Sequence, residues 1–135
     1  MTAEGRAATG ASAWALGMLV LVPIPFLGAL AAGGGMIAAY GSLSRQGPLA
    51  KQNAAAARAW GRLFLVSSTA LLLAQLVIGL VRMTAPSAPA TGFFPQGIPF
   101  ALYIVVCVVH LVVVLVALRR ACRGEVVRVP FVRSA

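Results

Sequence analysis

The chain has 135 residues, of which 61% are hydrophobic and only 10% are charged. A soluble domain of this length cannot bury so much apolar surface, because small domains have a large surface for their volume. The net charge of +9 would favour a nucleic-acid ligand in a soluble protein. Here the basic residues border apolar segments, so we expect anionic lipid headgroups as the partner and no nucleic acid.

The first predicted element is the uncharged segment from Trp14 to Tyr40, which is longer than one upright membrane span requires. Pro23 and Pro25 lie near its middle, and a proline inside a helix removes a backbone donor and displaces the preceding turn. Two structures satisfy this pattern: one kinked, proline-broken span, or a re-entrant hairpin with both ends on one side of the membrane. The pattern favours the kinked span.

A cleaved signal peptide is a further alternative for this segment, because Ala29-Leu30-Ala31 resembles a processing site. Cleavage would leave two spans whose basic flanks most simply lie outside the cell. That placement would break the rule that positive residues flank spans on the cytoplasmic side.

Small residues recur along the second half of the first segment at intervals of four, three and four: Gly28, Ala32, Gly35 and Ala39. Ala70 and Ala74 make a shorter stripe in the second span. Such stripes let helix backbones approach closely in a membrane. We expect them to serve helix packing, either within the bundle or between copies of the chain.

Residues 48–62 are predicted to form an amphipathic helix that lies on the membrane surface before the second span. Lys51, Arg58 and Arg62 share one helical face, the remaining surface is rich in alanine, and Trp60 is a candidate interfacial anchor. Each basic residue near an anionic surface contributes about 1 kcal/mol. The expected role is orientation and anchoring, and docking of a partner is the alternative.

The second and third spans are predicted at 63–81 and 100–118, and each contains nineteen uncharged residues. At about 1.5 Å per residue, each covers a hydrocarbon core of roughly 30 Å. The connector between them, 84–99, contains four prolines and cannot be helical throughout. Within it, Phe93 and Phe94 are expected to enter the membrane interface.

Together these elements predict an all-α membrane protein with a single domain over residues 1–135, built as a three-helix transmembrane bundle with spans at about 14–40, 63–81 and 100–118. The connector after the first span and the tail 119–135 hold nine of the eleven Lys and Arg residues. That side is therefore predicted to be cytoplasmic, with the N-terminus outside. A hairpin would move only the N-terminus inside.

The residue types needed for catalysis are scarce. Glu4 and Glu125 are the only carboxylates and lie near the two ends of the chain, so one chain cannot form an acid–base pair. Cys107 and Cys122 lie within and just after the third span, so we expect neither a disulfide nor a zinc site. We expect no enzymatic activity, no cofactor and no metal.

His110 is the one ionisable side chain deep within a predicted span, and Gln75 lies at a similar depth on the second span. Such groups carry a functional hypothesis by default. One interpretation is a proton relay or a ligand contact. The other is a neutral imidazole that hydrogen-bonds Gln75, Ser67, Ser68 or a backbone carbonyl, and the lack of a carboxylate in the spans favours it.

Two stretches carry a resemblance to a known family: residues 48–60, in which Pro48 precedes a polar helix with an Asn53-Ala54 step leading to Trp60, and Ala121-Cys122-Arg123-Gly124-Glu125 followed by Arg128-Val129-Pro130. They resemble small bacterial membrane proteins of the domain of unknown function 4870 group, also called Tic-twenty-like. The family's Leu-Asn-Phe-Gln junction is Arg58-Ala59-Trp60-Gly61 here, so no role of that Asn and Gln carries over. The resemblance implies three spans, a bacterial inner-membrane location and a cytoplasmic tail.

The tail also has a physical interpretation. Gly124 can adopt the left-handed cap that ends a helix, and the basic residues Arg119, Arg120 and Arg123 are placed to contact lipid headgroups or a partner. Val127 and Val129 alternate with Arg128, which predicts a short extended segment at the interface.

These observations predict a small non-enzymatic membrane protein that serves as an accessory or assembly subunit of a larger membrane complex. The first alternative is a self-associating transport or protein-translocation component with His110 near the pathway. A third hypothesis is a lipid- or stress-responsive membrane organiser that acts through Lys51, Arg58 and Arg62.

Overall fold

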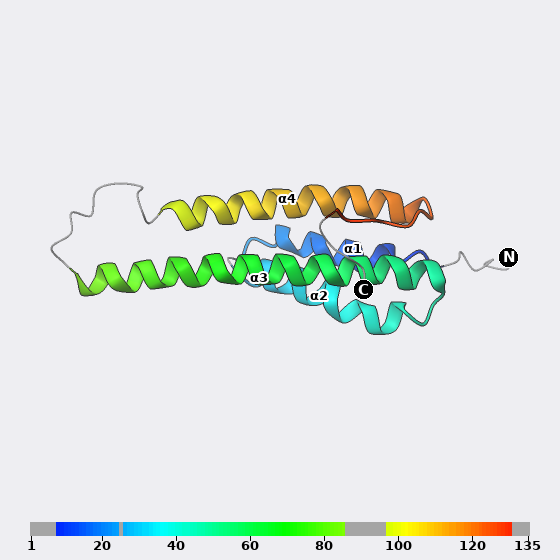
Figure 1. The fold of residues 1–135 in the computed structure, drawn as a ribbon, viewed down its shortest axis with the longest axis horizontal. Coiled ribbons are helices and arrows are strands. Elements are labelled where there is room, and N and C mark those ends of the chain that lie inside the picture. The colour runs from blue at the N-terminus through cyan, green and yellow to red at the C-terminus, as the bar shows by residue number, and fades with distance from the viewer. Residues whose placement is uncertain (1–7, 25, 86–96, 131–135) are drawn as a thin grey trace.

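The computed structural model describes residues 8–24, 26–85 and 97–130, and in these residues the regular structure is entirely helical (Figure 1). The prediction of an all-α chain is therefore confirmed for the described part of the chain. Its elements, in chain order, are α1 (Ala11–Ala15), the 3₁₀ helix η1 (Leu16–Leu21), α2 (Leu27–Leu43), α3 (Pro48–Thr84) and α4 (Gly97–Cys122).

Two long antiparallel helices, α3 and α4, form the length of the molecule (Figure 1). Their 37 and 26 residues correspond to about 55 Å and 39 Å of helix, more than the roughly 30 Å of a hydrocarbon core. Both are long and apolar enough to cross a membrane. They contain the predicted spans 63–81 and 100–118, whereas the connector residues 86–96, with Phe93 and Phe94, lie outside the described residues.

The first apolar segment is a helical hairpin. After η1 the chain leaves the helical conformation at Val22, whose ψ is 121°, and α2 then runs back along η1 (Figure 1). The antiparallel register is visible at two glycines: Gly35 faces the Leu16 side chain, and Gly28 faces the carbonyl oxygens of Leu19 and Val22. The expectation of one kinked span over 14–40 is therefore wrong. The segment reverses direction as the hairpin alternative expects, and its re-entry into a membrane stays a prediction.

Proline and glycine explain the reversal together. Pro23 cannot donate a backbone hydrogen bond, so η1 cannot continue through it. A Cβ atom at Gly28 would lie 2.9 Å from the carbonyl oxygen of Val22, a distance that side-chain carbons do not tolerate. Glycine at this position lets α2 begin directly against the chain that it has just left. The three-span bundle becomes two long helices with a short hairpin packed beside them.

The predicted surface helix 48–62 is not a separate element. It forms the first half of α3, which continues without interruption to Thr84. Its alanine-rich face is covered by protein, since Ala50, Ala54 and Ala57 are fully buried. The prediction of a helix lying on the membrane before a turn is therefore wrong. The hairpin and α4 take the contacts that the membrane surface was expected to provide.

The two predicted spans are staggered along the bundle. Trp60, which precedes the second span, and Phe64, near its start, both contact His110 in the middle of the third span. Arg62, between them on α3, therefore lies level with the centre of the apolar stretch of α4. The offset between the centres of the two uncharged stretches is about nine residues, or roughly 13 Å of helix.

The end of α4 follows the predicted cap. Gly124 has φ of 75°, its N–H donates to the carbonyl of Ala121 at 3.0 Å, and the N–H of Glu125 donates to the carbonyl of Arg120 at 3.1 Å. This pair of bonds is the Schellman arrangement that satisfies the last carbonyls of a helix. The tail then crosses from α4 towards α3 with Val127 buried and Arg128 exposed. The predicted extended segment falls in residues 125–129, which form no helix, and its position at a membrane interface stays a prediction.

Candidate functional site

His110 is fully buried where α3, α4 and η1 meet, with 0% of its surface exposed. The indole Nε1–H of Trp60 lies 3.1 Å from its Nδ1, and the carbonyl oxygen of Gly17 lies 3.1 Å from its Nε2. The ring of Phe64 stacks on the imidazole with centroids 3.7 Å apart. Three elements that are distant in the sequence therefore meet on one side chain.

The partners define the protonation state of the ring. An indole N–H can only donate, so Nδ1 of His110 accepts. A carbonyl oxygen can only accept, so Nε2 carries the proton and donates to Gly17. Both nitrogens are thus satisfied in the neutral imidazole, as expected for an ionisable group in an apolar bundle. The hydrogen bond to a backbone carbonyl is the arrangement that the structural interpretation of His110 anticipated.

Gln75 does not join this site. It lies about three turns beyond Phe64 along α3, and its Oε1 is shielded from solvent without a hydrogen-bond partner in the described part of the chain. Ser67 and Ser68 bond to carbonyls of their own helix instead. The predicted His110–Gln75 contact is therefore wrong, and Trp60 occupies the place expected for a polar residue of the second span.

Asn53 forms a second buried polar centre, at the end of the bundle where the hairpin begins. Its side chain is 0% exposed. Its Nδ2 donates to the carbonyls of Thr9 at 2.7 Å and Glu125 at 3.1 Å, while its Oδ1 accepts from the N–H of Val127 at 2.8 Å. One amide on α3 thus holds both the start of the hairpin and the tail.

Sequence reasoning missed the role of Asn53. A polar residue within the run from Lys51 to Arg62 fits the exposed side of an amphipathic helix equally well. The available indication was its position next to Ala54, on the side of the helix that carries small residues rather than charges. Both residues are fully buried.

Most of the predicted basic contacts lie at the end of the molecule that carries Asn53, whereas Arg62 lies level with His110. Arg58 is half-buried and its guanidinium lies 4.8 Å from the centroid of the Tyr40 ring, in a cation–π arrangement. Arg120 contacts Glu125, with 3.3 Å between Nε and Oε2, and both side chains are about half exposed. The other predicted contacts are exposed: Lys51, Arg62, Arg119 and Arg123.

The small-residue stripe of the first segment lies within the hairpin. Gly28 and Gly35 face η1, Ala32 is fully buried, and Ala39 packs against the main core cluster. A different pair brings α2 against α3. A Cβ atom at Gly61 would lie 3.1 Å from the carbonyl oxygen of Gly33, so this crossing requires glycine and was not anticipated from the sequence.

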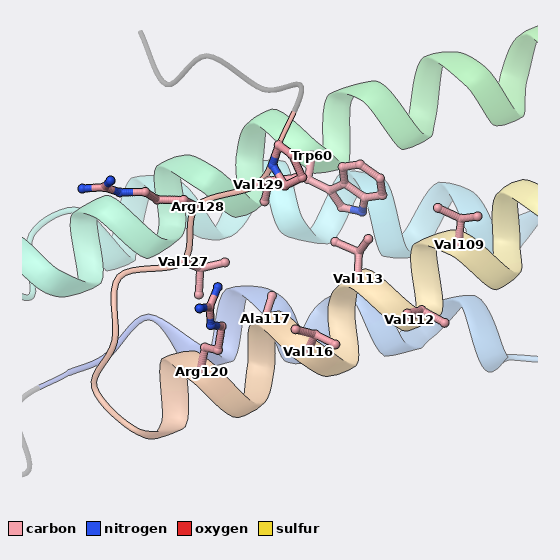
Figure 2. Close-up of a pocket in the computed structure, with 11 residues that line it drawn as sticks. Trp60, Val109, Val112, Val113, Val116, Ala117, Arg120, Val127, Arg128 and Val129 are labelled. Carbon is pink, nitrogen blue, oxygen red and sulfur yellow. The ribbon is translucent and has the colours of Figure 1, made fainter.

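A groove of about 350 Å³ lies between α3 and α4, and the tail crosses its basic end (Figure 2). One face of α4 supplies its long wall with four valines, Trp60 of α3 lies opposite, and the tail closes the end with Val127, Val129 and Pro130. Figure 2 shows the lining running from Val109 at the apolar end to Arg128 at the basic end. The two charged residues in the lining are Arg120 and Arg128.

The described residues contain no group of three or more His, Cys, Asp or Glu side chains placed to hold a metal ion. Cys107 and Cys122 are free thiols. Comparison of the chain with protein-family models, with curated proteins and with solved structures finds no match. The features of the described residues that bear on function are the two buried polar centres, the basic end and the groove.

Proposed function

We propose that the protein is a non-enzymatic, multi-pass protein of the bacterial cytoplasmic membrane that serves as an accessory or assembly subunit of a larger membrane complex. In this proposal α3 and α4 cross the membrane, and the end of the bundle that carries Asn53 faces the cytoplasm. The hairpin enters from the same side, so both termini are cytoplasmic. The basic residues at this end support the orientation.

The observation that carries the proposal is the partial coverage of the two long helices. The hairpin packs on the half of α3 that holds Asn53 and Gly61, while beyond Phe64 the large apolar side chains of α3 are mostly exposed. On this uncovered half, a Cβ atom at Gly79 would meet nothing within 4 Å. A helix of another protein could therefore approach the backbone closely there, the contact that stabilises helix pairs in membranes.

The polar centres fit a scaffold better than a transport pathway. Both nitrogens of His110 have partners within the chain. Asn53 makes three hydrogen bonds within the chain, two from Nδ2 and one to Oδ1. A proton relay needs an unoccupied donor or acceptor that can change partner. Membership of the domain of unknown function 4870 group remains a prediction that agrees with this role.

The test is a pull-down of tagged protein at native expression level, extracted into polymer nanodiscs and analysed by mass spectrometry. We expect a stoichiometric membrane partner that is lost in Gly79→Leu. The matched control is Val77→Leu, at the same depth and about 200° around the helix, which should retain the partner. Recovery of a pure homo-oligomer would instead support self-associated transport, and a monomer without partners would contradict the proposal.

A further inference from the structure

We propose that the groove between α3 and α4 binds one acyl chain of an anionic phospholipid of the cytoplasmic leaflet, with Arg120 and Arg128 contacting the lipid phosphate. This site rests on the proposed membrane location and orientation, and adds to them a specific ligand.

The wall of the groove suits a hydrocarbon chain. Val109, Val112, Val113 and Val116 follow the spacing three, one, three, which places them along a single face of α4. Trp60 covers the opposite side, and its one polar atom is already bonded to Nδ1 of His110. The interior therefore offers apolar surface without an unsatisfied donor, and its volume of about 350 Å³ is within the range of small-molecule sites.

The length of the groove matches one leaflet. From Val109 to Arg120, α4 rises by about 16 Å. Half of a hydrocarbon core of roughly 30 Å is about 15 Å, the depth that one acyl chain fills. A chain that lies along the valines therefore brings its headgroup to Arg120, two residues after Leu118, the last uncharged residue of the span.

Charge complementarity selects the headgroup. In the described part of the chain Glu125 is the one carboxylate, and it contacts Arg120 at an exposed position. Arg128 has no acidic partner among these residues, and Figure 2 shows its side chain extending from the groove towards the basic end of the molecule. A phosphodiester at this end would meet two guanidinium groups, which bind phosphate oxygens through paired N–H groups.

Trp60 makes the site measurable, because the chain has only one other tryptophan, Trp14. Trp14→Phe leaves Trp60 as the sole indole; it also removes a buried Nε1–H that has no hydrogen-bond partner among the described residues. The protein is reconstituted into vesicles of equimolar phosphatidylglycerol and phosphatidylcholine, with mid-chain bromines on one lipid or the other. Surface charge is then identical in both vesicles, and only the quencher differs.

We expect brominated phosphatidylglycerol to quench Trp60 more strongly, with a relative association constant about tenfold above that of phosphatidylcholine. Arg120→Gln combined with Arg128→Gln should reduce this ratio to near one. The control, Arg45→Gln, removes a charge from an exposed position at the same end of the bundle and should keep the preference.

A second pair of variants tests the groove itself. Val112→Phe adds bulk to the groove wall and should reduce quenching by both lipids, whereas Val108→Phe adds the same bulk at an α4 position that does not line the groove. Their valines are equally exposed, at 55% and 56%. If Trp14→Phe does not fold, native mass spectrometry of the unaltered protein replaces it, with one retained phosphatidylglycerol as the expected result.

Equal quenching by the two lipids, or equal loss of preference in both arginine and control variants, would overturn the proposal in favour of unselective boundary lipid. Absence of quenching by either lipid would mean that protein fills the groove, and would also overturn it. A chain that fails to enter the vesicles would refute the proposed membrane location itself, which flotation of the vesicles detects separately.

Discussion

The indole Nε1–H of Trp60 donates to Nδ1 of His110 across 3.1 Å, joining α3 to α4. The same imidazole donates to the carbonyl of Gly17. His110 is therefore the residue through which the hairpin and both long helices share one hydrogen-bonded centre.

Replacing His110 by alanine should lower the free energy of unfolding by about 3 kcal/mol, because it creates a cavity beside Phe64 and leaves the Trp60 donor unpaired. Denaturant titration in mixed micelles measures the change. Cys107→Ala, one turn away on α4 at a half-buried site, is the control and should cost less than about 1 kcal/mol. Equal losses in the two variants would argue against a special role for the imidazole.

Replacing Gln75 by an apolar residue should raise the free energy of unfolding. Its Oε1 is shielded and lacks a partner in the described chain, so Gln75→Leu removes the cost of an unsatisfied acceptor and should stabilise the protein by about 1 kcal/mol. The same titration measures it. Gln52→Leu, at an exposed position on α3, should change stability by less than about 0.5 kcal/mol. Destabilisation by Gln75→Leu would show that the amide has a partner after all.

The Asn53 centre predicts coupled release of both chain ends. Asn53→Ala leaves two carbonyls and one N–H without their partner and should cost about 2 kcal/mol. We expect tryptic cleavage after Arg128 to accelerate at least tenfold. Mass spectrometry of the released peptide measures the cleavage rate. Asn53→Asp should be worse, since a carboxylate cannot donate to the carbonyls of Thr9 and Glu125. Gln52→Ala, the neighbouring exposed residue, should leave the cleavage rate unchanged.

Two glycines of α3 should behave differently when alanine replaces them. At Gly61 the new Cβ would lie 3.0 Å from the Met36 Cβ and 3.1 Å from the Gly33 carbonyl, so we expect a loss of about 2 kcal/mol as α2 is pushed away. At Gly79 the space is open, and the higher helix propensity of alanine should add about 0.8 kcal/mol. Thermal unfolding in nanodiscs compares the pair. Similar changes at both positions would refute the close α2–α3 crossing.

The hairpin predicts that the start of α1 lies on the same side of the membrane as the end of α4. A third span would place the start of α1 on the opposite side. In a background with both native cysteines replaced, Ser12→Cys should react with an impermeant maleimide in inverted membrane vesicles. Native Cys122, which is exposed, should react in the same vesicles in a Cys107→Ala background. Thr84→Cys, at the other end of α3, should react only in right-side-out vesicles. Labelling of both Ser12→Cys and Thr84→Cys in right-side-out vesicles would support the kinked span instead.

Much of this fold can be predicted from features that are local in the sequence. The uncharged stretch of α4 and the second half of α3 follow from length and hydropathy, and the Gly124 cap follows from a single residue type. The hairpin could not be decided in the same way. Pro23 breaks a helix in either alternative, and the choice depends on partners remote in sequence, such as the contact of Gly17 with His110. The buried role of Asn53 likewise requires the tail to be in place.

In the proposed membrane location, the stagger between α3 and α4 has a consequence for the surrounding lipid. A flat bilayer of uniform thickness cannot match both uncharged stretches, because their centres are offset by roughly 13 Å along the length of the helix pair. Tilting the pair reduces the mismatch, and Arg62 can extend its guanidinium towards the headgroups from beside His110. The remaining mismatch is relieved by thinning the adjacent leaflet. The protein should therefore favour thinner membrane regions and deform thicker ones.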